Sequence, residues 1–177
     1  MLAHILVEPG RLELMEVETP KAGPGEIVVK IRSALTCGTD LKAFRRGHPM
    51  MPMPTRFGHE FAGDVAEVGE SVTGFTIGDP VMAVHTYPCL TCYYCLRGLE
   101  NLCESVMQTM VLGAYAEYMK LPTEIVRHNV YRKHDILSSI EAAILEPLAC
   151  VMCGIDQITV REDDTVLIVG AGAIGLM

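Results

Sequence analysis

The chain has 177 residues, of which 50% are hydrophobic and 20% charged, so it can bury a core and does not resemble a disordered or fibrous chain. Fourteen basic and 22 acidic residues give a net charge of −8, which argues against a broad basic surface for nucleic acid or anionic lipid. The best 18-residue apolar run, residues 138–155, contains Glu141 and Glu146, so no membrane span is expected.

Seven cysteines, an odd number, do not suggest a disulfide framework. The first residues, MLAHILVEPG, lack the basic region and the small-residue cleavage site of a signal peptide. We therefore expect reduced thiols that bind metal or lie in a core, in a cytoplasmic protein.

Residues 1–121 show the pattern of a strand-rich region. Alternation over Glu26–Leu35 predicts a strand, and Asp40–Arg46 can form a short helix that ends at Gly47. Three prolines in His48–Thr55 predict an irregular loop.

The pattern becomes helical near residue 138. Ser138 and Glu141 have the spacing of a capping box, which predicts a helix start. Pro147 is expected to break that helix and to begin a second one that runs to about Ile158. Glu146 is then at the junction of two helices, where its side chain can point into a cleft.

The strongest motif is a set of four cysteines with C-x2-C-x2-C-x7-C spacing: Cys89, Cys92, Cys95 and Cys103. Four thiolates at such spacing are typical of a closed, tetrahedral structural zinc site. An iron–sulfur cluster is the first alternative, but in the bacterial run the last cysteine follows after three residues and precedes proline. Plain core cysteines are the second alternative.

A second set of metal-ligating side chains is dispersed along the chain. Cys37 follows a predicted strand, His59 and Glu60 precede another, and Glu146 is at the helix junction. One thiolate, one imidazole and two carboxylates suit a catalytic zinc site that keeps a position open. Each residue also has an ordinary structural interpretation, so residue type alone leaves this site open.

A glycine-rich motif, GAGAIG, follows the apolar segment Thr165–Val169, which we expect to form a strand. Gly170, Gly172 and Gly175, with Ile174 beside the last, have the G-x-G-x-x-G spacing of a dinucleotide-binding turn. The helix and the acidic residue that complete this motif would lie after residue 177. A glycine-rich turn without a cofactor is the alternative.

Taken together, these motifs resemble the zinc-containing medium-chain dehydrogenase/reductase (alcohol dehydrogenase) superfamily, and in particular its sorbitol/threonine dehydrogenase-like branch. The zinc signature G-H-E-x2-G-x5-G-x2-V of that superfamily is matched by Gly58, His59, Glu60, Gly63, Gly69 and Val72. The run Gly98–Cys103 is similar to its structural-zinc lobe, Gly113–Tyr118 to a strand of its catalytic core, and Glu146–Ala149 to its polyol branch.

The resemblance implies a mostly β GroES-like catalytic domain with a structural-zinc lobe over residues 1–145. Residues 146–177 would be an inter-domain helix and the first strand and phosphate loop of an α/β Rossmann domain. Members of the superfamily are about twice as long, so we expect an N-terminal portion that is inactive alone, from a homodimer or homotetramer.

The resemblance also assigns roles in the zinc- and NAD- or NADP-dependent oxidation of a small alcohol or polyol. Cys37 and His59 would bind the catalytic zinc directly, Glu60 would exchange with water as a ligand, and Glu146 would bind the metal or its water. Thr39 would take the alcohol proton. The glycines Gly170, Gly172 and Gly175, with Ile174, would contact the cofactor.

Besides its shorter length, the chain departs from the superfamily at one residue, and two rival functions remain. Lys42 replaces a histidine that often relays protons in the superfamily, and Cys150 and Cys153 are expected to be buried apolar cysteines. His85 is expected to be a surface or loop residue. The rival functions are a non-enzymatic four-cysteine zinc module that binds no nucleotide and, less favoured, a reductase of enals or quinones from the same superfamily.

Overall fold

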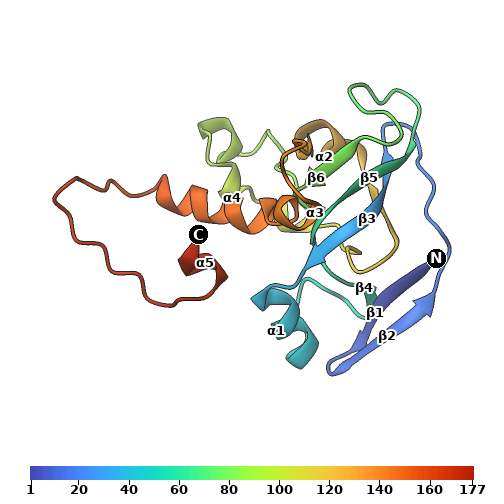
Figure 1. The fold of residues 1–177 in the computed structure, drawn as a ribbon, viewed down its shortest axis with the longest axis horizontal. Helices are drawn as coiled ribbons and strands as arrows, with labels where there is room; N and C mark the ends of the chain where they lie inside the picture. Colours follow the sequence, from blue (N-terminus) through green and yellow to red (C-terminus); the bar gives the residue numbers. More distant parts are fainter.

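Two antiparallel sheets make up the main body of the computed structural model, which describes all 177 residues (Figure 1). The strands are β1 (Leu2–Glu8), β2 (Arg11–Glu16), β3 (Ile27–Leu35), β4 (Thr55–Arg56), β5 (Glu60–Val68), β6 (Pro80–Ala83), β7 (Tyr118–Leu121) and β8 (Val130–Arg132). The helices are α1 (Gly38–Arg46), α2 (Thr123–His128), α3 (Ser139–Ala142), α4 (Leu145–Ile155) and α5 (Ala173–Leu176), with 3₁₀ turns η1 (Cys95–Arg97), η2 (Glu100–Leu102) and η3 (Val106–Thr109).

The larger sheet, in the order β7-β3-β5-β6-β8, carries the main hydrophobic core. Ile27, Val29, Phe61, Val65 and Val81 are each no more than 1% exposed. Burial of each such side chain contributes roughly 1.5–3 kcal/mol. The predicted strand over Glu26–Leu35 is therefore confirmed, because its alternating apolar residues face this core.

The pairing of β3 with β5 brings two loop residues to one edge of the sheet. Leu35, the last residue of β3, pairs with Glu60, the first residue of β5. Cys37 follows that pair on one strand and His59 precedes it on the other. Antiparallel pairing therefore holds these two side chains side by side although 22 residues separate them.

Helix α1 begins two residues before the predicted start at Asp40. Its N-cap is Cys37, whose Sγ accepts a hydrogen bond from the Thr39 N–H, while the Asp40 carboxylate accepts one from the Cys37 N–H. Cysteine is not among the usual N-cap residues, so the cap could not be read from residue type. The helix ends before Gly47, as expected.

The predicted capping box of Ser138 and Glu141 is confirmed at the start of α3. The predicted break at Pro147 is wrong in position, because α4 already begins at Leu145 and ends at Ile155 rather than Ile158. Residues in the first turn of a helix have no intrahelical acceptor for their N–H groups, so Pro147 loses no hydrogen bond there. Glu146 is in this first turn.

Residues 156–177 extend away from the sheets and return so that α5 lies alongside α4 (Figure 1). The predicted strand Thr165–Val169 does not form, and Leu167 and Val169 are 84% and 91% exposed. A strand needs a neighbour to accept its backbone hydrogen bonds, and no strand of this chain lies beside it.

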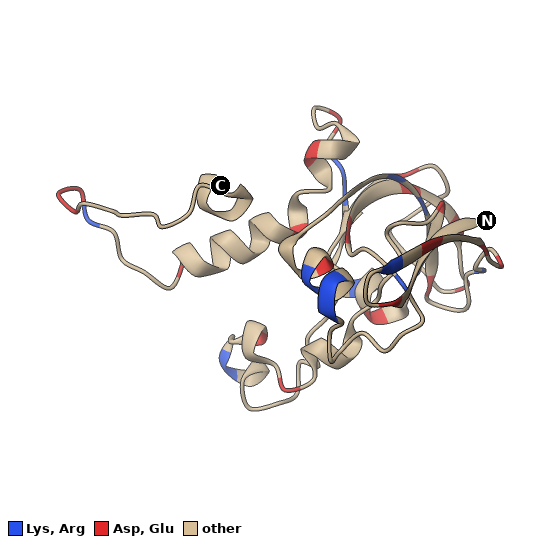
Figure 2. Cartoon of the chain, turned by 90° about the horizontal axis from the view of Figure 1, so that it is seen from below, with Lys and Arg blue, Asp and Glu red and all other residues tan.

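Basic and acidic residues are interspersed along the chain (Figure 2). Arg45 and Arg46 stand together in the last turn of α1. None of the helices has both the length and the apolar character needed to cross a lipid bilayer.

Candidate metal centres

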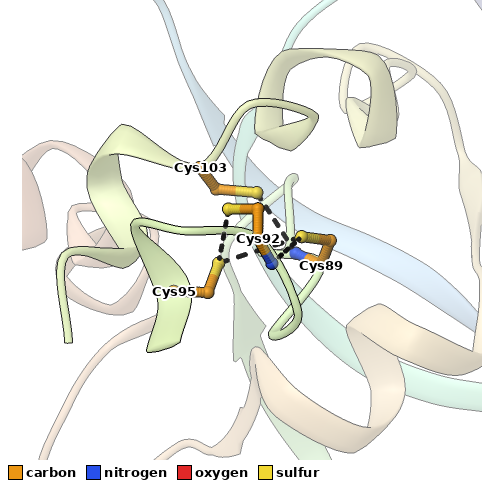
Figure 3. A group of neighbouring side chains, drawn as sticks. All are labelled: Cys89, Cys92, Cys95 and Cys103. Carbon is orange, nitrogen blue, oxygen red and sulfur yellow. Dashed lines mark hydrogen bonds between the residues drawn. The ribbon is translucent and has the colours of Figure 1, made fainter. Parts of the chain in front are cut away.

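The four-cysteine motif folds into a lobe between β6 and β7 (Figure 3). All four sulfur atoms lie within 4.8 Å of one another, with Cys92 and Cys95 3.5 Å apart and Cys89 and Cys95 3.9 Å apart. A tetrahedral zinc ion with Zn–S bonds of about 2.3 Å separates its sulfurs by about 3.8 Å. The spacing therefore fits a single bound ion.

The four cysteines of the lobe differ in acidity when no metal is bound. Backbone and side-chain hydrogen bonds from Thr91 lower the pKa of Cys89 to about 5, so its thiolate is favoured. Burial and the neighbouring thiol of Cys92 raise the pKa of Cys95 instead. Four adjacent thiolates repel one another unless a divalent cation lies among them.

The dispersed residues also meet, at the edge of the sheet where β3 ends and β5 begins. The Sγ of Cys37 lies 3.3 Å from the Nε2 of His59. One donor atom each from His59, Glu60 and Glu146 lies within 4.8 Å of the others. His59 and Glu60 are 5% and 3% exposed. The four residues predicted for the catalytic zinc thus fall into two overlapping groups that share His59, one with Cys37 and Asp40 and the other with Glu60 and Glu146.

Asp40 is a further member of this site that the sequence interpretation missed. Its side chain is 1% exposed, and its Oδ1 lies 3.1 Å from the Nδ1 of His59. Its Oδ2 accepts hydrogen bonds from the Cys37 N–H at 3.0 Å and from the Tyr115 hydroxyl at 3.1 Å. Because Nδ1 faces this carboxylate, Nε2 is the nitrogen left to bind a metal beside Cys37. The capping-box spacing of Cys37 and Asp40 is the signal that could have revealed it.

The charges of Asp40 and His59 stabilise each other. Burial acts to raise the pKa of Asp40, but the His59 imidazole and the Cys37 N–H outweigh it and leave the pKa below its ordinary value. Burial acts to lower the pKa of His59, and the Asp40 carboxylate outweighs that effect, so the pKa is raised. A carboxylate behind the imidazole also makes it a better metal ligand.

Glu60 is 3% exposed and lines the cavity described below. Burial raises its pKa, and the nearby Glu146 carboxylate raises it further, against a lowering effect of His59. Two facing carboxylates in a buried site repel each other, and a divalent cation between them removes the repulsion. The residue types of the two groups, a thiol, an imidazole and carboxylates, therefore suit a zinc ion bound at His59.

His85 lies in the loop after β6, as predicted, but it is buried rather than at the surface. His85 is 9% exposed, its ring centroid lies 4.6 Å from that of His59, and its Nδ1 has no partner. Burial and the His59 charge lower the pKa of His85 to about 3, so it is neutral at neutral pH. The apolar residues of β6 draw this part of the chain into the core, which the loop signals around His85 do not indicate.

The prediction that Cys150 and Cys153 are buried is also wrong, since Cys150 is exposed and Cys153 half-buried. The Cys150 thiol donates to Oε1 of Glu146 at 3.7 Å. Partial burial and this carboxylate raise the pKa of Cys150 to about 11. Helix α4 protrudes from the sheets, so its apolar composition does not place both cysteines in a core.

One cavity of about 1,020 Å³ joins the dispersed site to the glycine-rich turn. Its lining includes Cys37 and Glu60 on one side and Gly170, Gly172, Ile174 and Gly175 on the other. A Cβ on Gly175 would lie 1.9 Å from the carbonyl oxygen of Gly170, so the turn requires glycine there. A Cβ on Gly172 would meet no atom, which leaves room for a ligand to approach the backbone. The glycine turn thus has the open backbone that a phosphate-binding turn needs, while the rest of the lining is mostly apolar.

Comparison with known proteins places these features in a family. Residues 23–130, more than half of the chain, match the family "Alcohol dehydrogenase GroES-like domain". Sorbitol dehydrogenase of Halalkalibacterium halodurans is 33% identical over 171 residues, which are 95% of this chain and 48% of that protein. Acryloyl-coenzyme A reductase of Metallosphaera sedula is 36% identical over 170 residues, which are 93% of this chain and 49% of that protein.

Solved structures agree with the sequence comparison. Galactitol-1-phosphate dehydrogenase from Escherichia coli superposes with a TM-score of 0.86 and 30% identity, over 99% of this chain and 50% of that one. The chain thus spans about half the length of the relatives that it matches. The predicted mostly β fold with a cysteine lobe is confirmed. The chain belongs to the alcohol dehydrogenase GroES-like domain family, within the zinc-containing medium-chain dehydrogenase/reductase superfamily that its motifs resemble.

Proposed function

We propose that this chain supplies the zinc-binding catalytic part of an NAD- or NADP-dependent dehydrogenase that oxidises a small alcohol or polyol to a ketone or aldehyde. The observation that carries the proposal is the single cavity shared by Cys37, Glu60 and the glycines of residues 170–175. A substrate at the metal residues and a nucleotide at the glycines would meet in that cavity, as hydride transfer requires.

Two zinc ions would bind per chain. Cys89, Cys92, Cys95 and Cys103 would hold the structural ion, whose binding free energy would stabilise a lobe with little core of its own. Cys37, His59, Glu60 and Glu146 would hold the catalytic ion. When bound, zinc acts as a Lewis acid that lowers the pKa of an alcohol, and nicotinamide accepts the hydride.

The residues of the chain itself would orient and deprotonate the substrate. Asp40 holds the His59 ring so that Nε2 faces Cys37. Thr39 lies in the first turn of α1, and its N–H donates to the Cys37 sulfur at 3.2 Å. Thr39 is thus next to the candidate metal residues, and its hydroxyl would accept the alcohol proton. Apolar side chains of the cavity, among them Ile144 and Val151, would exclude water.

Elemental analysis of the purified chain, with an absorption spectrum, tests this proposal. We expect close to two zinc ions per chain and no visible absorbance. Iron with a brown chromophore would contradict the assignment of the four-cysteine lobe, and an absence of metal would contradict both centres.

Activity distinguishes the dehydrogenase from the non-enzymatic zinc module. The chain alone is expected to be inactive on polyols, because residues 146–177 supply only the proposed start of a nucleotide domain. The full-length gene product should reduce NAD or NADP in the presence of an alcohol or polyol. A full-length product that binds zinc but no nucleotide would support the module instead.

A reductase is the second candidate, because acryloyl-coenzyme A reductase of Metallosphaera sedula is among the relatives. The two groups of possible zinc ligands around His59 favour the alcohol dehydrogenase. Oxidation of a nicotinamide cofactor by an enal or enoyl thioester, unaffected when zinc is removed, would favour the reductase.

The same proposal includes a homodimer or homotetramer of the whole protein. It would be located in the cytoplasm, where the seven free thiols of this chain would remain reduced.

A further inference from the structure

Tyr115, in the segment before β7, is fixed by contacts with the residues that lead into His59. Its backbone N–H donates to the carbonyl of Phe57 at 2.9 Å, and its own carbonyl accepts the N–H of His4 at 2.8 Å. The rings of Tyr115 and Phe57 meet edge to face, with their centroids 5.6 Å apart. The backbone and the ring of Tyr115 are therefore both held in place.

The ring of Tyr115 occupies the space beside the backbone at Gly58. A Cβ added to Gly58 would lie only 2.6 Å from a carbon of this ring. Gly58 is the residue directly before His59. The aromatic part of Tyr115 is thus packed against the backbone that carries the imidazole.

The hydroxyl of the same side chain reaches the other half of the site. It lies 2.8 Å from the carbonyl oxygen of Leu35, 2.9 Å from Oγ1 of Thr36 and 3.1 Å from Oδ2 of Asp40. The Thr36 hydroxyl can itself donate to the Tyr115 oxygen, which leaves the single Tyr115 proton to the carbonyl and the carboxylate. One hydroxyl therefore holds the end of β3 and the first turn of α1 together.

The carboxylate that this hydroxyl contacts needs its donors. The Asp40 side chain is 1% exposed, and its Oδ2 also accepts the N–H of Cys37 at 3.0 Å. A buried charge that loses a hydrogen-bond donor is strongly destabilised. Burial, and after it the Asp40 charge, raise the pKa of Tyr115 against a lowering effect of Thr36, so the hydroxyl keeps its proton and can donate.

We propose that Tyr115 is a positioning residue of the catalytic metal centre and that it acts through the Asp40 carboxylate. Because its hydroxyl fixes Oδ2 of Asp40, Oδ1 stays 3.1 Å from Nδ1 of His59, and Nε2 is directed toward Cys37. Tyr115 itself would bind neither metal nor substrate. This inference rests on the proposed function, because it needs a metal bound at His59.

Zinc affinity, measured by competition with a chromophoric chelator, tests the inference. Tyr115→Phe keeps the ring against Gly58 and removes only the hydroxyl. It should weaken binding at the catalytic centre by up to about tenfold, the lower end of the loss expected when a residue behind a metal ligand is changed. The four-cysteine lobe should be unaffected. Tyr131→Phe, which removes a hydroxyl that donates to the His128 carbonyl at 3.2 Å, is the matched control and should change neither affinity.

A double-mutant cycle tests whether Tyr115 acts through Asp40. In a chain that already carries Asp40→Asn, adding Tyr115→Phe should weaken zinc binding by less than about twofold further, because the carboxylate that the hydroxyl positions is gone. Losses that multiply in the double variant would show that Tyr115 acts independently of Asp40, and the proposal would be wrong.

Cadmium-113 NMR of the chain loaded with ¹¹³Cd²⁺ gives a readout that a purely structural role would not change. We expect one resonance from the four-cysteine lobe and one from the catalytic centre. Only the second should move in Tyr115→Phe, whereas general destabilisation would lower the unfolding temperature and move neither. Thermal unfolding of the metal-free variants checks that they fold.

The possible results separate this inference from the proposal beneath it. Unchanged affinity and an unchanged second resonance in Tyr115→Phe would overturn the role of Tyr115 and leave the catalytic centre intact. If the wild type shows only the four-cysteine resonance, the catalytic metal centre itself is wrong and the role of Tyr115 falls with it.

Discussion

The Asp40 carboxylate lies 3.1 Å from the His59 imidazole, and the two side chains are among the few buried polar groups of the chain. The same carboxylate accepts the N–H of Cys37. One side chain thus orients both of the predicted zinc ligands that flank the β3–β5 pairing. A metal centre assembled in this way depends on a residue that need not touch the metal.

Asp40→Asn should weaken metal binding at the catalytic centre by about 10–100-fold, since the amide keeps the shape of the carboxylate but not its charge. Competition between the protein and a chromophoric zinc chelator measures this affinity, and the four-cysteine lobe should be unaffected. Asp79→Asn, which alters a surface turn paired with Arg132, is the matched control. Equal losses in both variants would indicate general destabilisation.

Cys92→Ser should remove one zinc ion per chain and lower the unfolding temperature. Three thiolates and a hydroxyl hold zinc less tightly than four thiolates, and the lobe exposes Tyr93 and Leu96 rather than burying them in a core. Elemental analysis and thermal unfolding, with and without a chelator, measure both effects. A variant that keeps two zinc ions would show that the four sulfurs do not share one ion.

Gly58→Ala should destabilise the protein and impair metal binding at His59. The φ angle of Gly58 is +83°, and an added Cβ would lie 2.6 Å from the ring of Tyr115. Backbone strain of this kind costs about 1–3 kcal/mol before the clash is counted. Chemical denaturation measures the free energy of unfolding. Gly154→Ala in α4, where a Cβ meets no atom, is the control and should be neutral or slightly stabilising.

The metal-free chain should lose stability through His85 as the pH falls below about 6.5. The pKa of His85 is about 3 in the folded chain against an ordinary value of 6.5, so the unfolded chain binds a proton that the folded chain does not. His85→Phe should reduce the slope of unfolding free energy against pH by up to about 1.4 kcal/mol per unit in this window.

The histidine beside it titrates with the opposite sign. The raised pKa of His59 gives a contribution that is complete below pH 6.5 and is lost as the pH rises through the higher folded value. The two histidines thus act in different pH windows. Denaturant titrations of the wild type and His85→Phe between pH 4 and 8, with the metal removed, would separate them. Identical slopes below pH 6.5 would contradict the buried, neutral state of His85.

The sequence predicted those features that depend on local spacing. The lobe of Cys89–Cys103 follows from the intervals between its sulfurs, and the strand of Glu26–Leu35 follows from its alternation. Ser138 and Glu141 revealed a cap because both are usual cap residues. The dispersed centre needed the family resemblance, since no local rule connects Cys37 to Glu146 across more than 100 residues.

The remaining features depend on long-range packing. Asp40 and His85 are buried by the packing of chain segments next to β5 and β6. No periodic pattern in the sequence near either residue indicates this burial. The segment Thr165–Val169 has the composition of a buried strand, but no strand in this chain pairs with it. The apolar neighbours of Cys150 suggest a core position, but the helix that carries it extends away from the core.

Because Leu35 pairs with Glu60, metal binding at the proposed centre would depend on the correct register of β3 and β5. A slip of one residue between β3 and β5 would turn Glu60 to the opposite face and carry His59 about 3.4 Å along the strand, away from Cys37. In such a misaligned sheet the ligand atoms of Cys37, His59 and Glu60 would be too far apart to bind one metal ion. Metal binding would therefore stabilise only the molecules with the correct register and shift the folding equilibrium toward them.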